Sequence, residues 1–159
     1  ITYIEEIKKN RYQKTKLYTE KLSLMVPDGL LPKNQTHISW KEASELPLCM
    51  LSPFMKEREV MDQAFEQVDC KPEPKLECNS IFQLAFHVMH GKIATVVPSG
   101  FCSANDAFPG TKEIQLNDPL ISKPVGLIWE KVTPPLSMPN ALSNVLIQAK
   151  DEINEAMNF

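Results

Sequence analysis

The sequence has little of what several large classes of protein require. Five glycines in 159 residues leave little for a glycine-rich nucleotide loop, and neither a phosphate-binding loop motif nor a Gly-x-Ser-x-Gly nucleophile motif occurs. No apolar run approaches the roughly 20 residues needed to span a bilayer. The formal net charge of −3 argues against nucleic-acid binding by this segment, because that function needs a concentrated basic face.

Metal, disulfide and export signals are also missing. The four cysteines have no metal-type spacing, which favours reduced thiols in a cytosolic protein: Cys49, Cys70, Cys78 and Cys102. His87 and His90 would share a helix, but no third ligand stands at a useful spacing, so we expect neither a metal nor another cofactor. The first residues lack the order of a signal peptide, and a cytoplasmic location is expected.

What the sequence does contain is a unit of apolar strand, polar cap and amphipathic helix that occurs twice. A third apolar run follows the second unit at once. This order is typical of an α/β protein with a parallel sheet. In chain order the elements are a strand at 46–51, Ser52-Pro53, a helix to about Val68, a strand at 75–78, Asn79-Ser80, a helix to about His90, and a strand at 93–97.

Other elements follow from periodicity and capping. Two strands are expected at 12–18 and 21–26, and Ser39 with Glu42 fits a capping box that opens a short helix. The helix from Ser80 is apolar nearly all round, which predicts heavy burial. Strands are expected at 114–116 and 125–129. A last helix begins at Ser137 with an apolar stripe of Leu142, Val145, Leu146, Ala149, Ile153, Ala156 and Met157.

The strand-to-helix corners are the candidate binding site. In parallel sheets ligands lie beyond the carboxyl ends of the strands, near helix N-termini whose free amides favour a polar or anionic molecule. Ser52 stands at one corner, where it can cap a helix that has Pro53 in its first position, face a ligand, or both. At the second corner either Asn79 or Ser80 caps the helix, which leaves the other free.

The order of motifs resembles the effector-binding (substrate-binding-like) domain of LysR-type transcriptional regulators over essentially the whole chain. The resemblance implies a type 2 periplasmic-binding-protein-like fold, with one complete α/β lobe and the C-terminal remnant of a second lobe. It rests on Glu20-Lys-Leu-Ser-Leu-Met-Val-Pro27, Leu46-Pro-Leu-Cys-Met-Leu-Ser52, Leu76-Glu-Cys-Asn-Ser80, Ile93-Ala-Thr-Val-Val-Pro98, Ile114-Gln-Leu-Asn-Asp-Pro119 and Val125-Gly-Leu-Ile-Trp129, followed by a terminal helix.

The resemblance also implies the division of the chain into domains. Regulatory lobe II would span 24–118, and the remnant of regulatory lobe I would consist of 1–23 and 119–159. The winged helix-turn-helix DNA-binding domain and the opening of lobe I would be absent from this chain, which is a departure from the family pattern. DNA would then be a partner only through that absent domain.

By this resemblance the chain is a ligand-sensing regulatory domain and not an enzyme. A small, anionic effector would bind between the lobes and modulate DNA binding and transcription by a homo-oligomer, a dimer or tetramer, with no membrane partner. Val97 and Pro98 would supply apolar walls, although strand packing explains them equally. The expected effector-binding residues are Ser52, Pro53, Asn79, Ser80, Val97 and Pro98. A periplasmic solute-binding protein of a transporter, or a cysteine hydrolase on the same scaffold, are the alternatives.

Overall fold

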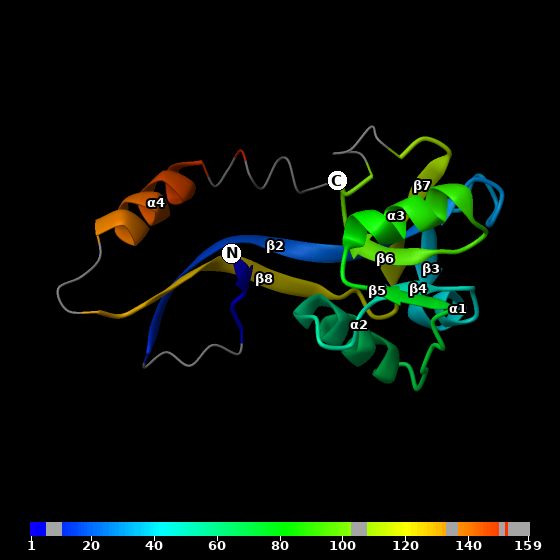
Figure 1. Ribbon diagram of the computed structural model, residues 1–159, viewed down its shortest axis with the longest axis horizontal. Helices are drawn as coiled ribbons and strands as arrows, with labels where there is room; N and C mark the ends of the chain where they lie inside the picture. Colours follow the sequence, from blue (N-terminus) through cyan, green and yellow to red (C-terminus); the bar gives the residue numbers. More distant parts are fainter. Residues whose placement is uncertain (6–10, 103–107, 133–136, 150–151, 153–159) are drawn as a thin grey trace. The chain divides into compact units, whose positions relative to one another are not determined.

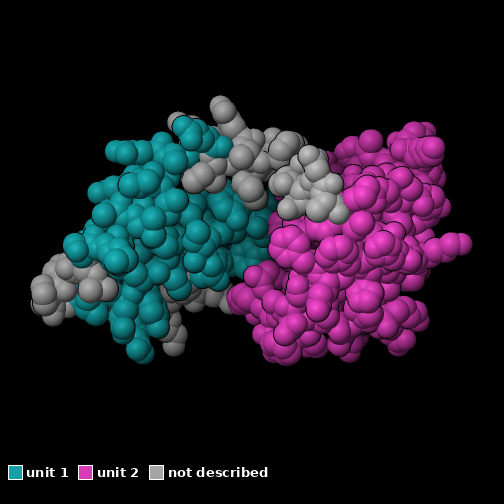
Figure 2. Space-filling view, turned by 45° about the horizontal axis from the view of Figure 1, so that its top comes forward, with its two compact units in different colours: residues 1–21, 122–159 teal, residues 22–121 magenta. Residues whose placement is uncertain are grey.

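The computed structural model describes residues 1–5, 11–102, 108–132, 137–149 and 152. The chain divides into two compact units, one of residues 1–21 and 122–159 and the other of residues 22–121 (Figure 2). It passes from one unit to the other twice, once within strand β2 (Tyr12–Pro27) and once between Ile121 and Ser122. The assignment of these units to regulatory lobes I and II stays a prediction.

The unit of residues 22–121 is built on a mixed sheet (Figure 1). The second half of β2 lies between β6 and β7 and is antiparallel to both, so that Met25 pairs with Thr95 on one side and Glu113 on the other. A parallel bridge between Leu48 and Ala94 joins a separate parallel pair, β4 and β5, to the strand that follows Ala94. The strands are β3 (His37–Ser39), β4 (Cys49–Leu51), β5 (Leu76–Cys78), β6 (Thr95–Pro98) and β7 (Thr111–Asn117).

Three helices pack on this sheet: α1 (Trp40–Ser44), α2 (Lys56–Glu66) and α3 (Ile81–His90). The predicted capping box opens α1, because the Ser39 hydroxyl accepts from the Glu42 amide and the Glu42 carboxylate accepts from the Ser39 amide at 2.9 Å. Trp40 is fully buried, packs edge-on against Phe65 with centroids 5.0 Å apart, and donates to the Pro119 carbonyl at 2.9 Å. The core of the unit therefore contains one tryptophan, which belongs to α1.

The unit of residues 1–21 and 122–159 has a smaller sheet. Strand β8 (Ser122–Glu130) lies between β1 (Thr2–Tyr3) and the first half of β2, and all pairings are antiparallel. A Cβ atom at Gly126 would lie 2.3 Å from the Thr15 carbonyl oxygen, so the close approach of β2 to β8 requires glycine there. The last helix of the unit is α4 (Ser137–Gln148). No helix in the described part of the chain is long and apolar enough to cross a membrane.

Two sequence-based expectations about element boundaries are wrong. The strands expected at 12–18 and 21–26 are a single strand, because Thr19, Glu20 and Lys21 continue the pairing with β8 as far as Ser122. The helix expected at Pro53 begins only at Lys56, with Met55 as its N-cap. In both places, cross-strand pairing or a turn decides a boundary that local composition does not show.

Two expectations about burial are also wrong. On α3, Phe82 and Phe86 are each 52% exposed; both rings pack over the buried ring of Phe108, and that of Phe82 also contacts Phe101. On α4, the residues of the predicted apolar stripe that can be assessed are exposed or half-buried, while Ser143 is buried and its hydroxyl is 2.8 Å from that of Thr15. Periodicity locates an apolar helix face, but it does not say whether another element covers that face. Ile153, Ala156 and Met157 lie outside the described residues.

Candidate functional site

Three parallel strands end at the same edge of the larger unit, and the predicted site residues follow them. Leu51 pairs with Cys78, so Ser52 and Asn79 are the next residues on neighbouring strands. The Ser52 amide donates to the Cys78 carbonyl at 2.8 Å, which fixes this neighbourhood. Pro98 is as many residues beyond Ala94 as Ser52 is beyond Leu48, and Leu48 and Ala94 are bridged in parallel. The edge predicted from the order of elements is therefore present within one unit.

The exposure of the predicted site residues differs from corner to corner. Pro53 and Asn79 are exposed, and Ser52, Ser80 and Pro98 are half-buried. Val97 has no exposed surface and belongs to the core. Of the two explanations that the sequence left open for Val97, strand packing accounts for its side chain. The other five residues offer surface to a ligand.

Ser52 does not cap the helix that follows it. Its carbonyl accepts from the Met55 amide at 3.0 Å, which closes a turn over Pro53 and delays the start of α2 to Lys56. The N-cap of α2, Met55, makes no side-chain hydrogen bond to the helix. Within the described residues the Ser52 hydroxyl has no hydrogen-bond partner. A ligand at this corner would meet a free hydroxyl and an uncapped helix.

At the second corner the cap is Ser80. Its hydroxyl accepts from the Gln83 amide at 3.4 Å. Among the described residues, no hydrogen bond involves the side chain of Asn79. The alternatives that the sequence left open are thus resolved, since Ser80 is occupied by the helix and Asn79 is available.

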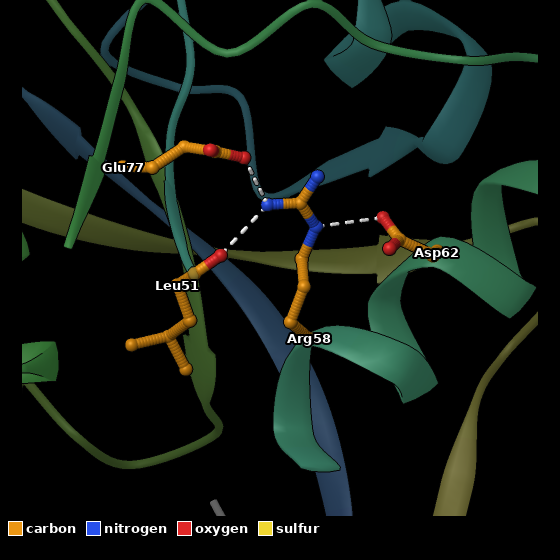
Figure 3. A network of polar contacts seen from close by, with 4 residues as sticks. All are labelled: Leu51, Arg58, Asp62 and Glu77. Carbon is orange, nitrogen blue, oxygen red and sulfur yellow. Dashed lines mark hydrogen bonds and ion pairs between the residues drawn. The ribbon is translucent and has the colours of Figure 1, made fainter. Parts of the chain in front are cut away.

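Sequence reasoning missed Arg58, which ties these corners together. Its Nη1 donates to the Leu51 carbonyl at 2.7 Å and to Glu77 Oε1 at 2.6 Å, and its Nε donates to Asp62 Oδ1 at 2.8 Å (Figure 3). Arg58 is only 8% exposed. One guanidinium therefore connects α2 with the carboxyl end of β4 and with β5.

A signal for this arginine is present in the sequence. Arg58 precedes Met61 by three residues and Phe65 by seven, so it lies on the buried stripe of α2. A cation on such a stripe needs partners, because an unpaired charge in a core is costly. Asp62, four residues further along α2, is one of those partners.

The charge of the Arg58 cluster is already balanced within the protein. Burial lowers the pKa of Arg58, but hydrogen bonds and charge interactions with Asp62 and Glu77 outweigh this and raise the pKa above its ordinary value. One cation thus faces two carboxylates, so the cluster is no receptor for an anion. The groups that remain for a ligand at the first two corners are neutral: the Ser52 hydroxyl and the Asn79 side-chain amide.

Two of the cysteine thiols are poorly suited to act as nucleophiles. Burial raises the pKa of the Cys49 thiol to about 11 and that of Cys102 to about 12, which is the opposite of what a nucleophilic cysteine needs. All four cysteines are free. Within the residues that the structure describes, no three histidine, cysteine, aspartate or glutamate side chains gather as a metal site would require.

Comparison with known proteins identifies the fold. The family model described as the LysR substrate binding domain matches residues 1–150. The effector binding domain of QuiR in complex with shikimate superposes with a TM-score of 0.78 and 14% identity, over 96% of this chain and 71% of that one. The regulatory domain of CcmR from Synechocystis PCC6803 in complex with 2-PG gives a TM-score of 0.79 and 10% identity, over 95% and 73%.

A longer regulator has the same fold. CbnR, a LysR family transcriptional regulator, superposes with a TM-score of 0.74 and 13% identity, over 94% of this chain and 51% of CbnR. The chain thus spans about half of the length of that protein. A search of curated proteins found no match. These results confirm the expected α/β class, with the type 2 periplasmic-binding-protein-like fold of LysR effector-binding domains.

Proposed function

Because this chain belongs to the LysR substrate-binding domain family, we propose that it is the ligand-sensing regulatory domain of a transcription regulator. The observation that carries the proposal is the shared edge of three parallel strands, where the side chains of Ser52 and Asn79 have no hydrogen-bond partner within the described residues and α2 begins without a side-chain cap. These groups are hydrogen-bond donors that meet at one place, which is what a small polar ligand requires.

The effector that fits this edge is a small, oxygen-rich acid. Carboxylate or phosphate oxygens accept hydrogen bonds from a hydroxyl, an amide and helix amides, and a helix N-terminus favours an anion by roughly 0.3–1 kcal/mol. Structural neighbours are described in complex with shikimate and with 2-PG, which is in keeping with a small-molecule effector. Ser52, Pro53, Asn79 and Pro98 would contact the effector, and Ser80 would hold α3 in place beside it.

The regulatory mechanism we propose is a shift of population. An effector that binds one arrangement of the two units more tightly favours that arrangement, by as much as its affinities for the two differ. In a homo-oligomer this changes how the DNA-binding parts are presented. CbnR is described in complex with its target DNA, which supports this role for a longer protein that carries the present domain.

Calorimetric titration of the chain with a panel of small acids, shikimate among them, tests the proposal. We expect at least one acid to bind, and its affinity to fall about tenfold or more in the double variant Ser52→Ala/Asn79→Ala, because two hydrogen bonds are lost. The matched control is Ser44→Ala, whose hydroxyl bonds only to the Lys41 carbonyl in the same unit. Equal affinity of the double variant and the control would overturn the site, and no binding by any acid would overturn the effector class.

A further inference from the structure

The turn that follows strand β6 is held by a carboxylate from strand β7. Glu113 Oε1 accepts from the Gly100 amide at 2.8 Å, and Oε2 accepts from the Cys102 amide at 3.2 Å. Gly100 is buried and has a φ of +85°, a conformation that favours glycine. The turn starts directly after Pro98, the third corner of the candidate effector site. The geometry of that corner therefore depends on a side chain fifteen residues further along the chain.

A second bond ties the same turn to strand β2. The hydroxyl oxygens of Ser23 and Ser99 lie 2.7 Å apart, and Ser23 is only 3% exposed. In the sheet Ser23 pairs with Val97 of β6 and with Gln115 of β7. A buried hydroxyl needs a partner, and Ser99 provides it.

The two strands that hold this turn are those that lead into the other unit. Strand β2 enters the larger unit at Leu22, one residue before Ser23, and β7 ends at Asn117, a short distance before the chain leaves at Ile121. The turn after Pro98 is thus hydrogen-bonded to both β2 and β7, the strands next to the two points where the chain crosses between the units. Neither bond is part of the backbone ladder, so the strands would pair without them.

We propose that Glu113 and the Ser23–Ser99 pair are positioning residues, which hold the Pro98 corner and couple it to the two strands that lead into the other unit. The proposal rests on the proposed function, to which it adds a route of regulation. An effector that contacts the turn would favour one geometry of it, and this preference would reach β2 through Ser23 and β7 through Glu113. If these bonds served stability alone, their loss would loosen either the turn by itself or all of the unit equally.

Amide hydrogen exchange of the full chain, followed residue by residue by NMR, separates these cases without an effector. Glu113→Gln keeps the size but turns an amide group toward backbone N–H donors, so one of the two bonds is lost. Ser99→Ala leaves the Ser23 hydroxyl without its partner. We expect both variants to exchange at least about fivefold faster at 22–24 and 115–117, with the β4–β5 amides at 49–51 and 76–78 unchanged.

Two further variants serve as controls. Glu42→Gln removes a carboxylate that also accepts a backbone amide in the same unit, but at α1, and should leave exchange at 22–24 and 115–117 unchanged. Ser99→Thr restores a hydroxyl and should return these rates toward those of the unchanged chain. The proposal is overturned if only the turn itself exchanges faster, or if all amides of the unit accelerate alike. Failure of the acid titration would leave this result intact, since no ligand is present.

Discussion

Replacement of Arg58 by methionine should destabilise the larger unit by about 2–3 kcal/mol. The change keeps a long side chain but removes three hydrogen bonds, to the Leu51 carbonyl at 2.7 Å, to Glu77 at 2.6 Å and to Asp62 at 2.8 Å. A hydrogen bond to a charged group contributes roughly 1.5–3 kcal/mol when it is buried. Leu51 is 3% exposed, so its carbonyl loses a donor that water replaces poorly.

The two carboxylates contribute less than the carbonyl. The side chains of Asp62 and Glu77 are 40% and 38% exposed and regain water when the cation is removed. Pairs with such exposure contribute about 0–1 kcal/mol each. The buried methionine offsets part of the loss by its apolar surface, roughly 1 kcal/mol. With each contribution taken at the middle of its range, the sum is about 2 kcal/mol, at the lower end of the expected loss.

Urea unfolding followed by tryptophan fluorescence measures this effect in the right unit. Trp40 packs against Phe65 of α2, whereas Trp129 belongs to β8 of the other unit, so a Trp129→Phe background reports the larger unit alone. Arg58→Lys is the informative companion, because an ammonium keeps the charge but lacks the planar fork that reaches three acceptors. We expect Arg58→Lys to lower the free energy of unfolding by about half as much as Arg58→Met does. A loss below about 0.5 kcal/mol for Arg58→Met would refute the argument that this cluster holds the corner.

Three other predictions follow from the structure. Hydrogen bonds from Ser39 lower the pKa of Glu42, so this carboxylate stabilises the fold above its unfolded pKa and loses that effect as the pH falls through the lower folded pKa. Glu42→Gln should therefore flatten the acid unfolding curve measured by circular dichroism, and an unchanged curve would contradict this. Cys49 and Cys102, with pKa values of about 11 and 12, should react slowly with a maleimide at neutral pH, and mass spectrometry that finds either labelled as fast as a free thiol would show the burial to be wrong. Gly126→Ala should lower the free energy of unfolding of the smaller unit by about 1–3 kcal/mol, because the new Cβ would lie 2.3 Å from a backbone oxygen. In urea unfolding, the fluorescence of the β8 tryptophan should then show a midpoint at lower urea concentration, and an equal shift for the α1 tryptophan would contradict this.

Local sequence signals were sufficient for the elements that depend on near neighbours. The capping box at Ser39 and Glu42 involves residues three apart, and the structure confirms it. The strand ends at Ser52 and Asn79 follow from apolar runs and polar caps, and they do lie on neighbouring strands. The family and the α/β class, which rest on the order of many such elements, are confirmed as well.

Other features depend on residues that meet only after folding. The burial of Arg58 depends on Glu77 of another strand. The polar residues at 19–21 continue a strand because β8 pairs with them. Arg58 and Glu77, and likewise residues 19–21 and β8, lie too far apart for one window of local sequence to contain both, so periodicity and propensity could not decide these features.

The sequence by itself determined the family, the α/β class and the edge at which the strands of both strand–helix units end, because strand–cap–helix order and parallel topology follow from patterns of nearby residues. Only the tertiary structure decided which groups at that edge are free and which are occupied. It assigns Ser80 to the cap of α3, leaves the side chains of Ser52 and Asn79 without a hydrogen-bond partner within the described residues, and places Arg58 between two carboxylates. The physical reason is that hydrogen-bond donors and charges are satisfied by whichever partners the fold brings close, however far apart they lie in the chain.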